Sequence, residues 1–141
     1  MVSIFSTASQ MSEALSKKEI SAVELTNLHF DRINQVDEKV HAFLHLDQSG
    51  ALAQAKAVDD KRAKGETLSP LAGIPLALKD VLAQKGQPTT CGSKMLEHWR
   101  PPYNATVVEK LLASGVVILG KTNMENLPWA HPLKTQHMVQ V

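Results

Sequence analysis

The chain has 141 residues, of which 43% are hydrophobic and 21% charged, which is enough apolar material for one soluble domain with its own core. Its formal net charge is +1 and its aromatic content 4%, so the composition indicates neither a basic nucleic-acid surface nor a base-stacking platform. No apolar run reaches the roughly 20 residues of a membrane span, no signal peptide is indicated, and the single cysteine, Cys91, excludes an internal disulfide and fits a reducing compartment.

The first half of the chain predicts three helices. Residues 8–17 place apolar side chains on one face of a short helix. A capping box, Ser21-Ala-Val-Glu24, then opens a second helix that continues with an approximate 3.6-residue period to about residue 36. Residues 40–46 are ambiguous between helix and extended chain. A third helix is expected over residues 49–64, with Gly65 as the residue that ends it.

The second half predicts a strand, a crossover and a second strand. Leu71-Ala-Gly-Ile-Pro-Leu-Ala-Leu-Lys79-Asp80 contains a short apolar strand. Loop compositions follow, with a short helix possible near residues 94–98. A second capping box, Thr106-Val-Val-Glu109, opens a helix closed by Gly115, and Val116-Val-Ile-Leu119 is a continuous apolar strand. This order is typical of a βαβ unit, so we expect an α/β fold with a largely parallel sheet.

Charged residues follow both predicted strands. Lys79 and Asp80 end the first, and Lys121 ends the second. Ligands of open α/β sheets bind at the carboxyl edge of the strands, where both lysines would lie if the strands are parallel. Taken alone, Lys79 is either a functional lysine or a side chain that reaches out to water. Two roles stay open for Lys121, ligand contact or a solvated strand end, and two for Asp80, orienting Lys79 or capping the turn.

Four ordered stretches resemble the amidase signature family, together with the helical start Ser21-Ala-Val-Glu-Leu25. They are the strand that ends in Lys79-Asp80, Thr89-Thr-Cys-Gly-Ser-Lys94, Pro101-Pro-Tyr-Asn-Ala-Thr-Val-Val-Glu-Lys110 and Gly120-Lys-Thr-Asn-Met124. The similarity runs from about residue 9 to residue 125 and is strongest to the branch formed by the A subunits of glutamyl-tRNA(Gln)/aspartyl-tRNA(Asn) amidotransferases.

The resemblance implies a fold and a mechanism. Residues 1–125 would form the N-terminal portion of the amidase signature fold, in which helices lead into a mixed, largely parallel sheet. In that family the lysine of the Gly-Ile-Pro strand is the general base, and it corresponds to Lys79. A serine in a cis peptide relays the proton, and a second serine attacks the amide carbon. We expect desolvation at the strand end to favour the neutral amine that a base requires, and an oxyanion hole of backbone N–H groups to stabilise the intermediate.

The resemblance also implies substrate and partners. Glutamine would be the substrate, and the released ammonia would pass to a partner protein that converts Glu-tRNA(Gln) into Gln-tRNA(Gln). The partners would be the B and C subunits of the amidotransferase, with tRNA reached only through the complex, in the cytoplasm or an organelle. This chain would bind no cofactor and no metal itself, since ATP and Mg²⁺ are used by the B subunit in that family.

The segment after Met124 departs from the family, whose two catalytic serines lie in a Gly/Ser-rich region further along. For Glu125 to Gln140, synonymous codons exist that, read one frame over, give Phe-Ala-Met-Gly-Ser-Ser-Thr-Glu-Asn-Ser-Ala-Tyr-Gly-Pro, which is like the family's own continuation. We therefore expect a single-base loss near residue 125, a chain truncated before the serines and inactive alone, and an aberrant, disordered tail over residues 126–141. Sequencing the gene from independent DNA tests this hypothesis.

The other candidate catalytic or metal-binding residues have weaker support from the sequence. Cys91 has no partner at a readable spacing and is interpreted as a structural or incidental thiol. His41 and His45 have the i, i+4 spacing of a helical metal pair, but the protease pattern is absent and the segment can be extended. Two alternative functions remain open: a fragment of an amidase of broader specificity, or a short binding or assembly module.

Overall fold

A computed structural model describes residues 2–124 of the chain. The expected tail, residues 126–141, lies outside these described residues. The elements in chain order are α1 Ala8–Ser16, α2 Ala22–Val40, β1 Phe43–Leu46, α3 Gln48–Ala63, β2 Pro75–Lys79, a 3₁₀ turn η1 Lys94–Leu96, α4 Thr106–Ala113 and β3 Val117–Thr122. None of the helices in this range combines the length and the apolarity that crossing a bilayer requires.

The three N-terminal helices begin where polar side chains satisfy their first N–H groups. Ser21 and Glu24 form the predicted capping box of α2, and Asp47 caps α3 by accepting from the backbone N–H of Gly50. The helix α2 runs four residues further than predicted and ends at His41, which adopts a left-handed backbone conformation. Residues 43–46 of the ambiguous segment are extended, because they pair with β3.

The predicted βαβ unit is confirmed. The sheet has the order β1-β3-β2, in which β2 and β3 are parallel and β1 is antiparallel to β3. The helix α4 makes the crossover, and Gly115 follows it with φ +81°, as expected of a residue that ends a helix. The central strand β3 is buried along residues 117–119, as its continuous apolar sequence predicts. Its burial also extends to Lys121, which the apolar pattern does not predict.

The second capping box is a wrong prediction. The N-cap of α4 is Ala105, and no side chain caps this helix, so Thr106 is already its first helical residue. The two residues ahead of the helix make hydrogen bonds to the loop that follows β2. Ala105 N–H donates to the carbonyl of Ala83 at 2.8 Å, and the side chain of Asn104 accepts from Lys85 N–H at 2.7 Å. These contacts hold residues 104 and 105 against the loop that follows β2.

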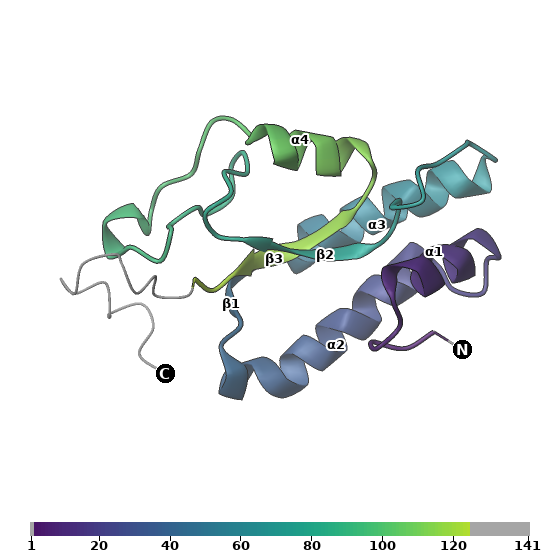
Figure 1. The fold of residues 1–141 in the computed structure, drawn as a ribbon, viewed down its shortest axis with the longest axis horizontal. Helices are drawn as coiled ribbons and strands as arrows, with labels where there is room; N and C mark the ends of the chain where they lie inside the picture. The colour runs from purple at the N-terminus through teal and green to yellow at the C-terminus, as the bar shows by residue number, and fades with distance from the viewer. Residues whose placement is uncertain (1, 125–141) are drawn as a thin grey trace.

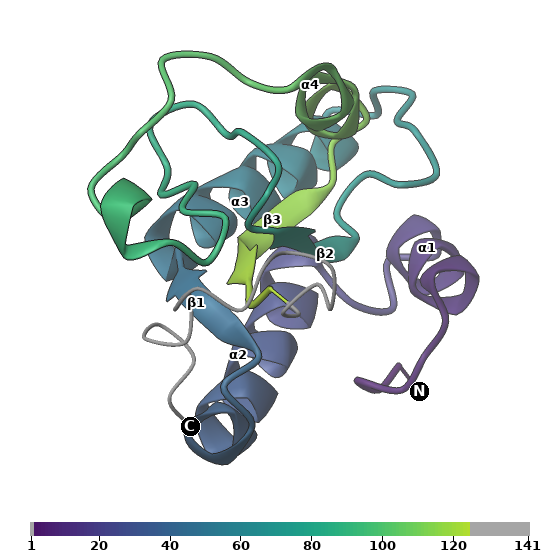
Figure 2. The ribbon, with the colours of Figure 1, turned by 60° about the vertical axis from the view of Figure 1, so that its left-hand side comes forward.

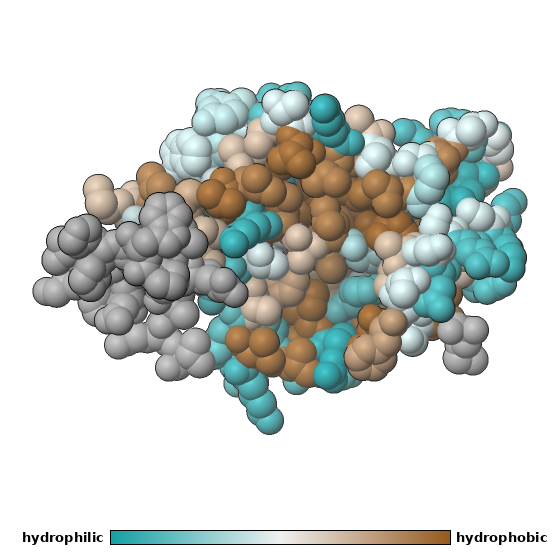
Figure 3. Space-filling view, in the orientation of Figure 1, coloured by the Kyte–Doolittle hydropathy of each residue, from teal (hydrophilic) through white to brown (hydrophobic). Residues whose placement is uncertain are grey.

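The two faces of the sheet carry different helices (Figures 1 and 2). Side chains from α1, α2 and α3 form one core with Val117 and Leu119 of β3. On the other face, Val108 of α4 packs with Leu78 of β2 and Ile118 of β3. Apolar surface also gathers across the middle of the face that Figure 3 presents, between α4 above and α1 and α2 below. The layers position the carboxyl ends of β2 and β3 beside one another, beyond the end of both cores.

Candidate functional site

Lys79 and Lys121 lie at the same edge of the sheet. In the parallel pairing of β2 with β3, Leu78 is the partner of Lys121 and Lys79 is the partner of Thr122. The prediction that both strand-end lysines share the carboxyl edge is therefore confirmed.

Lys79 and Asp80 nevertheless face in opposite directions. Leu78 and Asp80 are buried, whereas Ala77 and Lys79 are exposed, as the alternation of a strand requires. The expected desolvation of Lys79 is not found in this structure, because β2 is an edge strand and Lys79 lies on its open face. Within residues 2–124, its Nζ makes no hydrogen bond and no ion pair.

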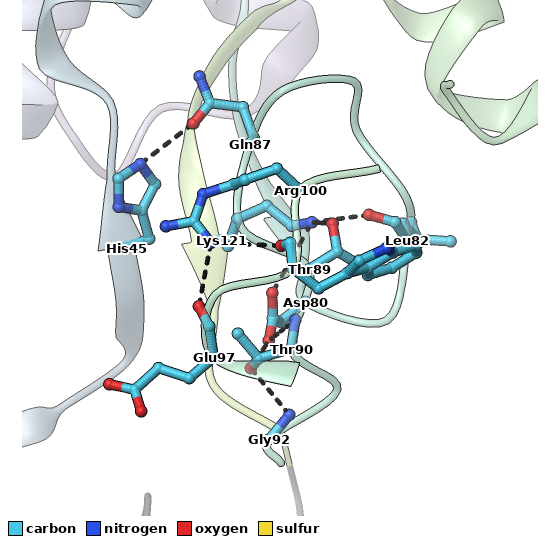
Figure 4. A network of polar contacts seen from close by, with 11 residues as sticks. His45, Asp80, Leu82, Gln87, Thr89, Thr90, Gly92, Glu97, Arg100 and Lys121 are labelled. Atoms are coloured by element: carbon cyan, nitrogen blue, oxygen red, sulfur yellow. Dashed lines mark hydrogen bonds and ion pairs between the residues drawn. The ribbon is translucent and has the colours of Figure 1, made fainter. Parts of the chain in front are cut away.

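Lys121 is the buried lysine of the site, with 1% of its surface exposed. Its Nζ donates to the carbonyl of Leu82 at 2.7 Å and to Thr89 Oγ1 at 3.1 Å, and it lies 3.8 Å from Asp80 Oδ1 (Figure 4). Neither expectation for Lys121 holds, because it is not solvated and its donors are directed into the protein. Two of the three donors of the ammonium group are thus used in hydrogen bonds, and Asp80 faces it as an ion-pair partner.

Asp80 is equally buried and joins this lysine to the loop that follows β2. Its Oδ2 accepts from the backbone N–H and from the hydroxyl of Thr90. Thr90 Oγ1 in turn accepts from the backbone N–H of Gly92 at 3.1 Å. The side chain of Asp80 thus contacts Thr90 and Lys121 and makes no contact with the side chain of Lys79 within residues 2–124, and sequence reasoning missed both threonines of this network.

Burial lowers the pKa of Lys121, although the nearby carboxylate of Asp80 opposes this change.

Burial raises the pKa of the Cys91 thiol, and the negative charge of Asp80 adds to this effect. A thiol with a raised pKa stays protonated and is a poor nucleophile. The interpretation of Cys91 as a non-catalytic residue agrees with this environment.

The lowered pKa of Lys121 has a measurable consequence for stability. Between the folded-state pKa and the ordinary value of 10.5, the unfolded chain binds more protons than the folded protein. The free energy of unfolding should therefore rise with pH across this alkaline window, relative to that of Lys121→Met. Urea denaturation of both proteins at about pH 8, 9 and 10 measures how the difference between their free energies of unfolding changes with pH. These pH values lie just below the ordinary pKa of a lysine side chain. A difference that stays constant or falls would contradict it.

A second polar chain joins β1 to the same loop. His45 Nε2 lies 3.1 Å from Gln87 Oε1, and Gln87 Nε2 donates to Asp47 Oδ2 at 2.8 Å. His41 ends α2 whereas His45 lies in β1, so the two histidines do not share a helix face. Among the residues that the structure describes, no group of three or more His, Cys, Asp or Glu side chains could hold a metal ion.

A cavity of about 460 Å³ lies elsewhere, between the turn that joins α1 to α2 and the C-terminal half of α3. Its lining includes Lys18, Glu24, Asp59 and Arg62. None of the predicted site residues lines this cavity, so its size does not make it the site of the predicted chemistry.

Comparison with known proteins identifies relatives of this chain. A family model described as Amidase matches residues 24–139. The A subunit of the glutamyl-tRNA(Gln) amidotransferase from Streptomyces coelicolor is 60% identical over 119 residues, which cover 84% of this chain and 24% of the relative. The corresponding protein of Chloroflexus aggregans is 50% identical with the same coverage. The chain thus spans about a quarter of the length of the curated relatives it matches.

Solved structures give the same picture at lower identity. The peptide amidase of Stenotrophomonas maltophilia is 31% identical, with a TM-score of 0.81 over 86% of this chain and 25% of that chain. A bacterial aryl acylamidase of the amidase signature family is 28% identical, with a TM-score of 0.79 over 84% of this chain and 25% of that one. The described residues therefore have the architecture of one part of these larger enzymes.

Proposed function

The chain belongs to the amidase family, and on this premise we propose that it is the N-terminal part of a glutamine-hydrolysing subunit of a tRNA-dependent amidotransferase. The names of its relatives support this assignment, since the A subunits from Streptomyces coelicolor and Chloroflexus aggregans are 60% and 50% identical to it. Glutamine would be the substrate, and transamidation of Glu-tRNA(Gln) would be the reaction served.

The position of Lys79 carries the proposed mechanism. Lys79 ends β2 at the carboxyl edge of the sheet, where its side chain is exposed and uncommitted within residues 2–124. A lysine that is not tied into an internal ion pair can serve as a general base once further polypeptide covers it and desolvation favours the neutral amine. Its neighbour Lys121 cannot take this role, because its ammonium group is bound by Leu82, Thr89 and Asp80.

The remaining catalytic groups are proposed on the family resemblance. A serine in a cis peptide would donate its hydroxyl hydrogen to the neutral amine of Lys79 and relay the proton, and a second serine would attack the amide carbon of glutamine. Backbone N–H groups would stabilise the tetrahedral intermediate. We place both serines in polypeptide outside these 141 residues, so the chain alone would not hydrolyse glutamine.

The exposed apolar surface is consistent with further polypeptide packing on this portion. Leu71 lies ahead of the edge strand β2, Val81 follows it and Val107 belongs to α4, and all three are more than two-fifths exposed. Apolar surface also gathers across the face that Figure 3 presents, and a contiguous apolar patch is typical of an interface. We propose that the remainder of an amidase domain covers it.

The partners follow from the same proposal. Ammonia would pass to the B subunit, which uses ATP and Mg²⁺, and the C subunit would complete the complex in the cytoplasm. A second candidate, an amidase of broader specificity, is favoured by the similarity to a peptide amidase and an aryl acylamidase. Binding to the B and C subunits would favour the first candidate, whereas hydrolysis of simple amides without them would favour the second.

A chimera tests the proposed function directly. The 119 residues of this chain that match the Streptomyces coelicolor protein would replace the corresponding region of that protein, expressed with that organism's own partner subunits. We expect the chimera to release ammonia from glutamine, whereas the 141-residue chain alone should not exceed background. An inactive but correctly assembled chimera, or glutamine hydrolysis by the chain alone, would contradict the proposal.

A further inference from the structure

We propose that Asp80 and Lys121 are positioning residues: a buried ion pair that ties both ends of the loop formed by residues 81–92 to the strand ends and thereby fixes the direction of Lys79. This inference rests on the proposed function, because it assigns Lys79 a role in catalysis. It concerns residues to which the resemblance gives no role.

The far end of the loop is held by Asp80. One carboxylate oxygen accepts two hydrogen bonds from Thr90, whose hydroxyl oxygen accepts from Gly92 N–H. Thr90 is 4% exposed and Asp80 1% exposed, so water does not compete for these bonds. Hydrogen bonds to a buried carboxylate are charge-assisted and are stronger than bonds between neutral groups. Asp80 therefore anchors residues 90–92 beside the end of β2.

The near end of the loop is held by Lys121. Its ammonium donates to the carbonyl of Leu82, two residues after Asp80, and to the hydroxyl of Thr89. One side chain of β3 thus bonds to both the start and the end of the loop that leaves β2. The carboxylate of Asp80 at 3.8 Å compensates the charge of Lys121. Its Oδ1 atom accepts no hydrogen bond from residues 2–124, so attraction to Lys121 is its compensation there.

These contacts constrain Lys79 although they do not touch its side chain. Leu82 N–H donates to the carbonyl of Lys79 at 3.0 Å, and Asp80 N–H donates to the carbonyl of Thr122 at 3.3 Å. Because Asp80 is held in the buried layer, strand alternation directs the preceding side chain, Lys79, to the open face. Displacement of a catalytic group by about 1 Å can reduce a rate by about 10²-fold. A loosened loop should therefore reduce turnover without removing the base.

Variants of the chimera separate positioning from stability. Asp80→Asn should lower kcat by about 10²-fold with little change in KM, as expected when geometry and not substrate binding is lost. The pair Asp80→Asn with Lys121→Met removes both buried charges, so it should regain stability relative to either single variant. It also removes the bonds to Leu82 and Thr89, so kcat should stay low. The control is Asp60→Asn, which alters an exposed ion pair with Lys56.

A kcat of the double variant within about twofold of wild type would overturn the inference, because the pair would then be only structural. A labelling experiment on the 141-residue chain gives an independent measurement. Acetic anhydride should modify Lys79 as fast as the exposed Lys85, and Lys121 at least about tenfold more slowly because it is buried. Asp80→Asn should expose Lys121 to the reagent.

Rapid labelling of Lys121 in the wild-type chain would also overturn the inference. The two experiments distinguish its failure from that of the proposed function. If the wild-type chimera is inactive, the proposed function fails, but the labelling still reports whether Asp80 holds Lys121 and the loop in place.

Discussion

Replacement of Lys121 by methionine is expected to lower the free energy of unfolding by about 3 to 5 kcal/mol, the usual cost of removing one partner of a buried ion pair. The carboxylate of Asp80 would stay in a site that is 1% exposed, without the cation that compensates it. The carbonyl of Leu82 and the hydroxyl of Thr89 would also lose their charged donor. Urea denaturation followed by circular dichroism measures the change.

A double-mutant cycle separates the ion pair from the rest of the site. Asp80→Asn alone should also be strongly destabilising, and the double variant should recover part of the loss because no buried charge remains. The exposed pair Lys56 and Asp60 supplies the control, since Lys56→Met should change the free energy of unfolding by less than about 1 kcal/mol. A cost for Lys121→Met as small as that of Lys56→Met would show that the buried pair does not stabilise the fold.

The βαβ unit could be predicted because its signals are local. The apolar run before Lys79, the glycine at position 115 that ends a helix and the apolar run of residues 116–119 can each be identified from neighbouring residues. The elements β2, α4 and β3 appear where these signals place them. The prediction that Lys79 and Lys121 share one edge then follows from the topology alone, because parallel strands end on the same side of the sheet.

The interior of the site could not be predicted, because it is made by contacts between distant residues. Lys121 bonds to Thr89 and Leu82, which are 32 and 39 positions away in the sequence. No local pattern distinguishes a lysine that is buried by such contacts from one that is solvated. Lys79, in contrast, is exposed. Side chains alternate along β2, so burial of Leu78 and Asp80 leaves the residue between them on the open face.

Lys79→Ala is expected to reduce kcat/KM for glutamine in the active chimera by about 10² to 10⁴-fold, the usual contribution of a general base. The substitution removes an exposed side chain that has no partner within residues 2–124, so the free energy of unfolding should change by no more than about 0.5 kcal/mol. Steady-state ammonia release and urea denaturation of the same preparation measure the two quantities. Lys85→Ala is the matched control, because Lys85 is also exposed and lies in the neighbouring loop.

Lys79→Arg distinguishes a base from a positive charge. Arginine keeps the charge and much of the length of lysine, but it is not deprotonated in proteins and so cannot accept a proton. If Lys79 is the base, this variant should be nearly as inactive as Lys79→Ala. If Lys79 only attracts the substrate or stabilises a developing negative charge, Lys79→Arg should retain most of the activity. Retained activity would exclude Lys79 as the base. Lys121 could not replace it in that role, because its ammonium group is bound by Leu82 and Thr89 and paired with Asp80.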